Sequence, residues 1–312
     1  MKKMMRVVLG ALCVVLCAGA AFAERLSSDP RLVPDYNRDG KIDPLDYERE
    51  AAGEPFTIWL NDDDDAAGAE ADEGKGDTNN DLHDVPGGEG NDRDCEDNHV
   101  NGRCDLLDFF PVLIDVTCVD EWQNYDWKLS SKSVNIVFTR LKADNAGSFH
   151  TQELKDFYED IPLYKAVVKQ LAGDDGEEAE PPDGFLVDGR GVIIVEGAAL
   201  GDKGLTLRGY RGDSVIAEVT MNLSVTNVED LYGWMNLRGE SVLLRELPPS
   251  QVTEDARRIQ GDNRHFVLVH GYNTNHEEAR GNAAEFYKKL WQSGSDAMFT
   301  AVEWRGHQSQ VK

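Results

Sequence analysis

Residues 191–225 read GVIIVEGAALGDKGLTLRGYRGDSVIAEVTMNLSV, and this stretch decides the fold class. Its β-branched and apolar residues fall into three runs, 191–196, 205–210 and 215–225, which glycine-rich turns separate. Runs of this length, bounded by Gly, Asn, Asp and Ser, are typical of β-strands joined by tight turns. The stretch therefore predicts consecutive strands rather than helices.

A further strand is predicted upstream at 134–141 (VNIVFTRL), whereas 151–171 has a helical spacing that Pro162 must kink or split. Several short strands at this spacing favour two packed antiparallel sheets. We therefore expect residues 121–248 to form a β-sandwich that resembles the immunoglobulin-like type. Because we find no cluster of titratable side chains in this region, its expected role is that of a spacer or a binding module.

Acidic residues are concentrated in the first part of the chain. The whole sequence has a formal net charge of −26, and residues 29–120 contain 27 Asp and Glu against 7 Lys and Arg. A segment with this charge repels nucleic acid and anionic membrane surfaces, so we expect neither as a partner. Such a segment either stays solvated and disordered or is neutralised by bound cations.

The sequence DYNRDGKIDPLD at Asp35–Asp46 has the spacing of a twelve-residue calcium loop. Gly40 occupies position 6, where the chain must turn sharply, and Ile42 occupies position 8, where an apolar residue anchors the loop. The predicted ligands at positions 1, 3, 5, 7, 9 and 12 are Asp35, Asn37, Asp39, Lys41 (through its backbone carbonyl), Asp43 and Asp46.

This loop resembles the EF-hand, and more closely the calcium loops of dockerins and other extracellular bacterial proteins. Position 12 is Asp46 rather than the usual Glu, and its shorter side chain reaches an ion less easily with both oxygens. Pro34 precedes the loop, no entering helix is visible, and only 45–52 looks helical after it. The resemblance implies Ca²⁺ as the bound cofactor. The alternative is a turn rich in Asp and Asn that binds no ion.

A second, weaker copy of the loop is predicted at Asp97–Asp108, which reads DNHVNGRCDLLD. His99 stands at position 3 and is a poor calcium ligand, while Cys104 takes the apolar position 8. We expect calcium to order residues 29–120 of the acidic region, because their like charges otherwise repel one another. The predicted ligands of this second loop are Asp97, Asn101, Arg103 (through its backbone carbonyl), Asp105 and Asp108.

The first 23 residues read as a secretory signal peptide. Basic residues precede an apolar run at 7–17, which is too short for a permanent membrane span, and Ala21-Phe22-Ala23 fits the small-x-small cleavage rule. We therefore expect a mature chain that starts at Glu24, has no membrane span, and is secreted, periplasmic or held at the cell surface. A buried N-terminal helix is the alternative.

The last part of the chain opens with an apolar strand at His265–Val269, which the turn His270-Gly271-Tyr272-Asn273 follows. A helical pattern and a second strand at Met298–Trp304 come next. This order of elements resembles the opening of an α/β-hydrolase domain. The resemblance implies that a backbone N–H of Tyr272 or Asn273 contributes to an oxyanion hole. A glycine turn in some other α/β domain is the alternative.

The nucleophile elbow of that family, Gly-x-Ser-x-Gly, does not occur in the 312 residues. We therefore expect the chain to be the N-terminal part of a longer, secreted bacterial α/β-hydrolase-like protein, whose nucleophile follows Lys312. The less favoured expectation is a complete chain with a degenerate tail.

The sequence predicts a multidomain fold class: an acidic calcium-loop region, an immunoglobulin-like β-sandwich, and the truncated start of an α/β-hydrolase domain. One function hypothesis is a secreted, calcium-stabilised serine hydrolase that acts on an ester or amide. The other is a non-catalytic, calcium-dependent surface or matrix binding protein. The predicted boundaries are 1–23 (signal peptide), 24–120 (acidic region), 121–248 (β-sandwich), 249–264 (linker) and 265–312 (start of the hydrolase domain).

Overall fold

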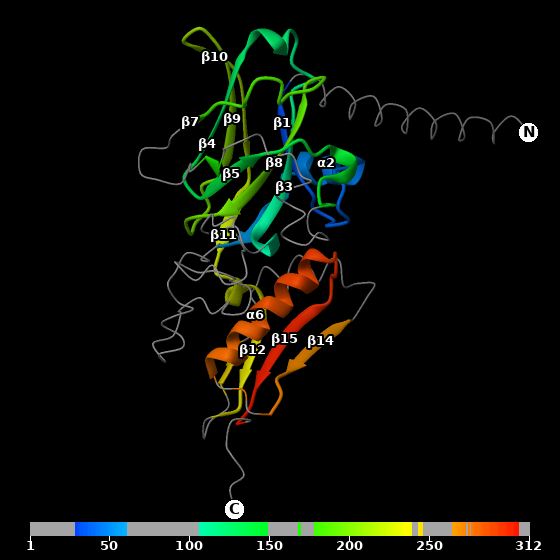
Figure 1. Ribbon diagram of the computed structural model, residues 1–312, viewed down its shortest axis with the longest axis vertical. Helices are drawn as coiled ribbons and strands as arrows, with labels where there is room; N and C mark the ends of the chain where they lie inside the picture. The colour runs from blue at the N-terminus through cyan, green and yellow to red at the C-terminus, as the bar shows by residue number, and fades with distance from the viewer. Residues whose placement is uncertain are drawn as a thin grey trace, which may run out of the picture.

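The computed structural model shows a protein built mainly from β-strands (Figure 1). A β-rich body forms one end of the molecule, and a smaller sheet with one long helix forms the other. Among the described residues there are two α-helices, α2 (Pro44–Ala51) and α6 (His276–Gln292). The structure describes residues 29–60, 106–148, 168–169, 178–238, 243–245, 264–272, 274 and 276–305.

The first sheet of the body has five antiparallel strands in the order β1-β3-β8-β5-β6. Its central strands are almost wholly buried because both faces of the sheet are covered. This burial explains why β8 is a continuous apolar run rather than an alternating one. The bounds are β1 Arg31–Pro34, β3 Phe109–Asp115, β5 Val134–Phe138, β6 Val168–Lys169 and β8 Arg190–Gly197.

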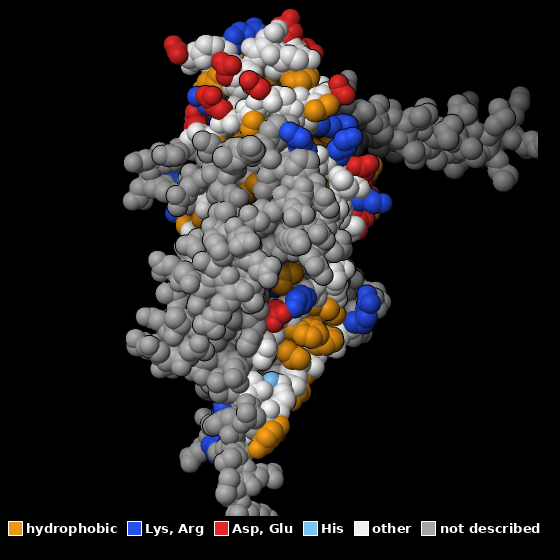
Figure 2. Space-filling model, viewed as in Figure 1, with side chains coloured by type: hydrophobic (Ala, Val, Ile, Leu, Met, Phe, Trp, Pro, Cys, Tyr) orange, Lys and Arg blue, Asp and Glu red, His pale blue; other side chains and the backbone are white. Residues whose placement is uncertain are grey.

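The second sheet has four antiparallel strands in the order β10-β9-β4-β7. Leu129, Leu205 and Leu207 are buried in one core with residues of β5 and β8, so the two sheets pack face to face. Acidic side chains gather at the end of the molecule where the β9–β10 hairpin lies (Figure 2). The bounds are β4 Asp126–Ser131, β7 Glu178–Ala179, β9 Leu205–Arg211 and β10 Ser214–Met221.

A short parallel pair, β2 (Phe56–Trp59) with β11 (Leu223–Thr226), closes the body beside Gly197 at the end of β8. A Cβ added at Gly197 would overlap the carbonyl oxygen of Trp59 and lie 2.8 Å from Cγ1 of Val225. Only glycine therefore allows β8 to approach the β2–β11 pair this closely.

Gly197→Ala should lower the free energy of unfolding by about 1–3 kcal/mol, because backbone must shift to admit the methyl group. Urea denaturation measures this change. Gly271→Ala is the matched control, since nothing lies within 4 Å of a Cβ at that position. The control should stay within about 0.5 kcal/mol of the parent. Equal effects of the two substitutions would contradict this account of Gly197.

The third sheet has the order β13-β12-β15-β14, with α6 connecting β14 to β15. Strands β12, β15 and β14 are parallel, and β13 is antiparallel to β12. The strands predicted at 265–269 and 298–304 therefore exist, with the second one ending at Glu303. The bounds are β12 Gly233–Asn236, β13 Leu243–Arg245, β14 His265–Val269 and β15 Met298–Glu303.

The predicted fold class is wrong. The described chain is a β-rich fold of several sheets, and it lacks the helix content of an α/β-hydrolase domain. A strand-helix-strand unit is a local pattern that many folds share, so it did not identify one of them. One of the two strands beside β15 is β12, which comes from 233–236 and thus from the segment assigned to the sandwich. Similarly, 168–169 form a strand at the end of the segment predicted to be helical.

Aromatic side chains join α6 to the body. Trp291 of α6 lies 5.2 Å from Trp59, 5.5 Å from Phe110 and 6.2 Å from Phe56, measured between ring centroids. These rings belong to the core cluster that also contains the β-sheet residues of the body. One hydrophobic core therefore runs through both ends of the molecule.

Candidate calcium site

The loop 35–46 follows β1, and its last three residues form the first turn of α2. Asp43 is the N-cap, and its side chain accepts a 2.8 Å hydrogen bond from the N–H of Leu45. The Asp46 carboxylate in turn accepts a 2.9 Å hydrogen bond from the backbone N–H of Asp43. Pro44 fits the first turn because its missing N–H needs no partner there. The exiting helix predicted from 45–52 is therefore present and strongly capped.

Side chains of the predicted ligands hold the loop in shape through bonds from its own backbone. Asp35 accepts the N–H of Arg38 at 2.6 Å on one oxygen and that of Gly40 at 2.8 Å on the other. Arg38 and Gly40 both have left-handed φ values, 59° and 83°. Glycine adopts this conformation without strain, which accounts for its place at position 6.

Asn37 and Asp39 repeat this pattern nearer the surface. Asn37 accepts the N–H of Asp39 at 3.0 Å, and Asp39 accepts that of Lys41 at 2.9 Å. At the other end of the loop, one Asp46 oxygen accepts the N–H of Tyr36 at 2.8 Å. The polar side chains of the loop thus accept hydrogen bonds from the loop's own backbone.

Asp35 and Asp46 are both buried, with exposed fractions of 5% and 0%. Burial, together with the nearby charges of Asp46 and Asp39, raises the pKa of Asp35 to about 7, although hydrogen bonds from the backbone of Gly40 and Arg38 act in the opposite direction. Burial also raises the pKa of Asp46. No basic side chain is among the largest influences on either pKa. The hydrogen bonds that Asp35 and Asp46 accept come instead from backbone N–H groups of the loop.

The residues fit calcium in type and order, although the carboxylates are not gathered around one point. Asp39 and Lys41 are exposed, while Asn37 and Asp43 are half-buried. No group of three or more His, Cys, Asp or Glu side chains in the described ranges is placed to hold a metal ion. The structure therefore brings two of the predicted carboxylates inside the loop and leaves the others nearer the solvent.

A second segment, 143–148, supports the loop from outside. Ile42 donates its N–H to the carbonyl of Ala143 at 2.7 Å, and Gly147 donates to the carbonyl of Gly40 at 3.0 Å. A Cβ at Gly147 would lie 2.6 Å from the Cα of Gly40, so the two backbones are in direct contact. Sequence reasoning missed this segment, and its only local signal is the run Asp144-Asn145-Ala146-Gly147.

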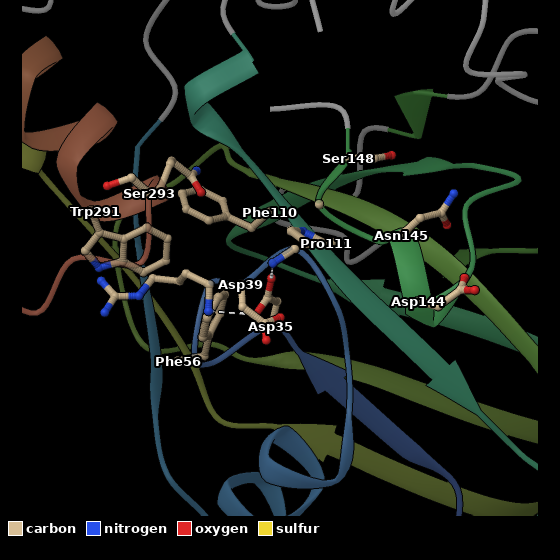
Figure 3. Close-up of a pocket in the computed structure, with 14 residues that line it drawn as sticks. Asp35, Asp39, Phe56, Phe110, Pro111, Asp144, Asn145, Ser148, Trp291 and Ser293 are labelled. Carbon is tan, nitrogen blue, oxygen red and sulfur yellow. Dashed lines mark hydrogen bonds between the residues drawn. The ribbon is translucent and has the colours of Figure 1, made fainter. Parts of the chain in front are cut away.

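A cavity of about 380 Å³ opens beside the loop (Figure 3). Asp35, Asp39 and Asp144 are among its lining residues, and in this view Asp35 and Asp39 lie between Trp291 and Asp144. Trp291, at the end of α6, contributes an aromatic wall, and the Arg38 guanidinium lies 4.8 Å from its ring centroid. Arg38 also pairs with Asp296. The loop is thus attached to the α6 end of the molecule.

The second predicted loop falls largely outside the described residues. Of its predicted ligands, Asp108 is described, in the 3-10 turn η1 (Leu106–Asp108). Its carboxylate is fully buried, accepts the Trp59 indole N–H and pairs with the Lys288 ammonium at 2.7 Å. Asp108 therefore has a charged partner within the core. The undescribed positions are Asp97, Asn101, Arg103 and Asp105.

The predicted oxyanion-hole turn lies at the end of β14. Tyr272 is 65% exposed, and Asn273 is outside the described residues. His270 accepts the backbone N–H of Trp304 at 3.0 Å, and the Trp304 indole donates to the His270 carbonyl at 2.7 Å. The His270 ring therefore links the ends of β14 and β15.

Comparison with known proteins gave no relative: no family model, no curated protein and no solved structure matches the chain. Within the described part of the chain, no helix is both long and apolar enough to cross a membrane. The predicted signal peptide lies outside that part.

Proposed function

We propose that this protein is an exported calcium-binding protein, and that an ion in the 35–46 loop stabilises its β-rich body. One observation carries the proposal. Asp35 and Asp46 are buried together in a loop with calcium-ligand spacing, and no basic side chain is among the largest influences on their pKa values. Burying two carboxylates without a cation is costly, so a divalent ion would relieve both charges at once.

Asp35, Asn37, Asp39, Asp43 and Asp46 would hold the ion with side-chain oxygens, and Lys41 would add its carbonyl. Bound calcium would place a double positive charge beside the buried Asp35 and Asp46 carboxylates. Because Arg38 of the same loop contacts Trp291 and Asp296, ordering of the loop would extend to α6.

Of the two function hypotheses, we favour the non-catalytic surface or matrix binding protein. Acyl transfer forms no part of the proposal, because that hypothesis rested on the α/β-hydrolase fold class that the structure corrects. A secreted, periplasmic or surface location fits the proposal, since extracellular calcium modules work at dissociation constants of about 10⁻⁴ to 10⁻³ M.

Isothermal titration calorimetry of the full chain should show calcium binding in that range, about 10⁻⁴ to 10⁻³ M. Asp39→Ala should weaken binding roughly tenfold, because affinity follows the number of charged ligands. Asp213→Ala is the matched control, an exposed carboxylate in the β9–β10 turn, and should bind as the parent does. Equal affinities of the two variants would place the ion elsewhere, and absence of binding would refute the proposal.

A further inference from the structure

A second cavity, of about 340 Å³, lies between the start of β4 and the turn that follows β7. We call it the aromatic–acidic cleft. It is separate from the predicted calcium loop, with which it shares no lining residue. One group of its lining residues is aromatic and another is acidic. The residues used below are Trp122, Tyr125, Trp127, Asp126, Glu180 and Asp183.

The aromatic wall of the cleft is fixed by contacts beneath it. The Trp127 indole is buried and donates to the carbonyl of Trp122 at 3.0 Å. A Cβ at Gly209 would lie 2.9 Å from the Trp127 ring, so the ring rests directly on β9. The Trp122 ring rests on Gly189 in the same way, at 3.2 Å from a Cβ built there. Both indoles are therefore in place before any ligand arrives.

The acidic wall is also anchored. Phe185 donates its N–H to the carbonyl of Pro182 at 3.0 Å, which closes the turn that carries Asp183. The Phe185 ring is buried 4.9 Å from Phe138, measured between centroids. Asp183 and Asp126 are exposed, and no described Lys or Arg pairs with either one.

Two basic side chains beside the cleft show which chemistry this surface attracts. The Arg211 guanidinium lies 4.9 Å from the Tyr125 ring centroid and 3.2 Å from Glu121. The Lys128 ammonium lies 5.6 Å from the Tyr210 ring centroid, and it pairs with Glu180 at 3.1 Å. Each of these two basic side chains therefore contacts both an aromatic ring and a carboxylate. The described lining of the cleft offers the same combination and contains no Lys, Arg or His.

We propose that the aromatic–acidic cleft binds an organic cation: an ammonium or guanidinium group, either free or on a Lys or Arg side chain of a partner polypeptide. The indole faces attract a cation through their quadrupole, and Asp126 and Asp183 supply the charge that it pairs with. The acidic side chains at this end of the molecule also draw cations toward it (Figure 2). A sugar ring could also stack on the aromatic wall and donate hydroxyl hydrogen bonds to the carboxylates, so a neutral sugar is the competing ligand in the test below.

Titration of the full chain with Nα-acetyl-lysine methylamide, followed by tryptophan fluorescence and calorimetry, tests the proposal. Tetramethylammonium is the minimal cation, and Nα-acetyl-norleucine methylamide is the neutral analogue. We expect both cations to bind and the neutral analogue to bind at least roughly fivefold more weakly. A lysine-containing peptide identifies the source of the cation: tighter binding than the free amide indicates a polypeptide, and equal binding indicates a small molecule.

The double variant Asp126→Asn with Asp183→Asn should weaken cation binding roughly fivefold to tenfold, since each exposed ion pair contributes modestly. Trp122→Ala should weaken it roughly threefold to fivefold. Asp202→Asn is the matched control, an exposed carboxylate in the loop between β8 and β9, and should bind as the parent does. The substituted acids are exposed, so the double variant should keep the melting temperature of the parent.

Three results would overturn the proposal: equal binding of the neutral analogue, binding of a malto-oligosaccharide in place of the cations, or no loss in the double variant. Each titration is repeated with a calcium chelator. The cleft contains no residue of the calcium loop, so the organic cation should bind equally well with the chelator present. Failure of the calcium proposal would therefore leave the proposal for the cleft intact.

Discussion

Without calcium, the protein should lose stability as the pH rises from about 4 to about 7, and calcium should restore that stability. Burial raises the pKa of Asp35 from 3.8 to about 7 in the folded state, so the folded protein holds a proton that the unfolded chain has released. The folded state therefore binds more protons across this window. The stabilisation that protonated Asp35 contributes is fully present below its unfolded pKa of 3.8. It decreases as the pH rises and is lost once the pH exceeds the folded pKa of about 7.

The loss is on the order of 4 kcal/mol at most, since each pKa unit corresponds to about 1.4 kcal/mol. Burial raises the pKa of Asp46 as well, and that shift acts in the same direction. Calcium reverses the effect because it binds the ionised carboxylates. At a free concentration of about 100 times its dissociation constant, it adds about 2.7 kcal/mol.

The measurement is urea denaturation at a series of pH values, with calcium and with a chelator. The substitution Asp35→Asn shows how much of the pH dependence comes from the Asp35 carboxyl, because an amide does not titrate. The variant should lose both the calcium response and most of the pH dependence. At low pH it should be about 1 kcal/mol less stable than the parent, since one amide oxygen cannot accept both N–H groups that Asp35 binds. An unchanged pH profile in this variant would disprove the assignment.

Lys288→Met should destabilise the protein by about 3–5 kcal/mol, because it leaves the buried Asp108 carboxylate without its ammonium partner. Both side chains are fully buried, and the pair joins α6 to η1 at the boundary between the two ends of the molecule. The measurement is again urea denaturation.

Lys289→Met is the matched control. Lys289 is the next residue along α6, but its side chain is 59% exposed and pairs with Glu285 one turn earlier, so the change should stay within about 0.5 kcal/mol. Combining Lys288→Met with Asp108→Asn should recover most of the loss, because Asn keeps an acceptor for the Trp59 indole N–H without a charge. A double variant as unstable as Lys288→Met alone would show that the loss comes from packing rather than from the unpaired carboxylate.

Local features of this protein could be predicted from the sequence. The strands at 134–138, 205–211 and 265–269 follow runs of β-branched and apolar residues, which are enriched in strands because they fit a pleated, half-buried surface. The helix after the loop was predicted at 45–52, and its capped start is also a local feature, because Asp43 and Pro44 act on neighbouring backbone groups. The order of potential ligand residues in the 35–46 loop can likewise be read directly from the sequence.

Only the tertiary structure decided how these pieces combine. The pairing of β12 with β15 joins segments far apart in the sequence, and a strand carries no signal for the identity of its neighbour. The same limit applies to Asp108, which the spacing predicted as a calcium ligand and which lies buried against Lys288. Spacing supplies the type and order of side chains. Burial and charge partners come from long-range packing, and these determine that Asp35 is buried while Asp39 is exposed.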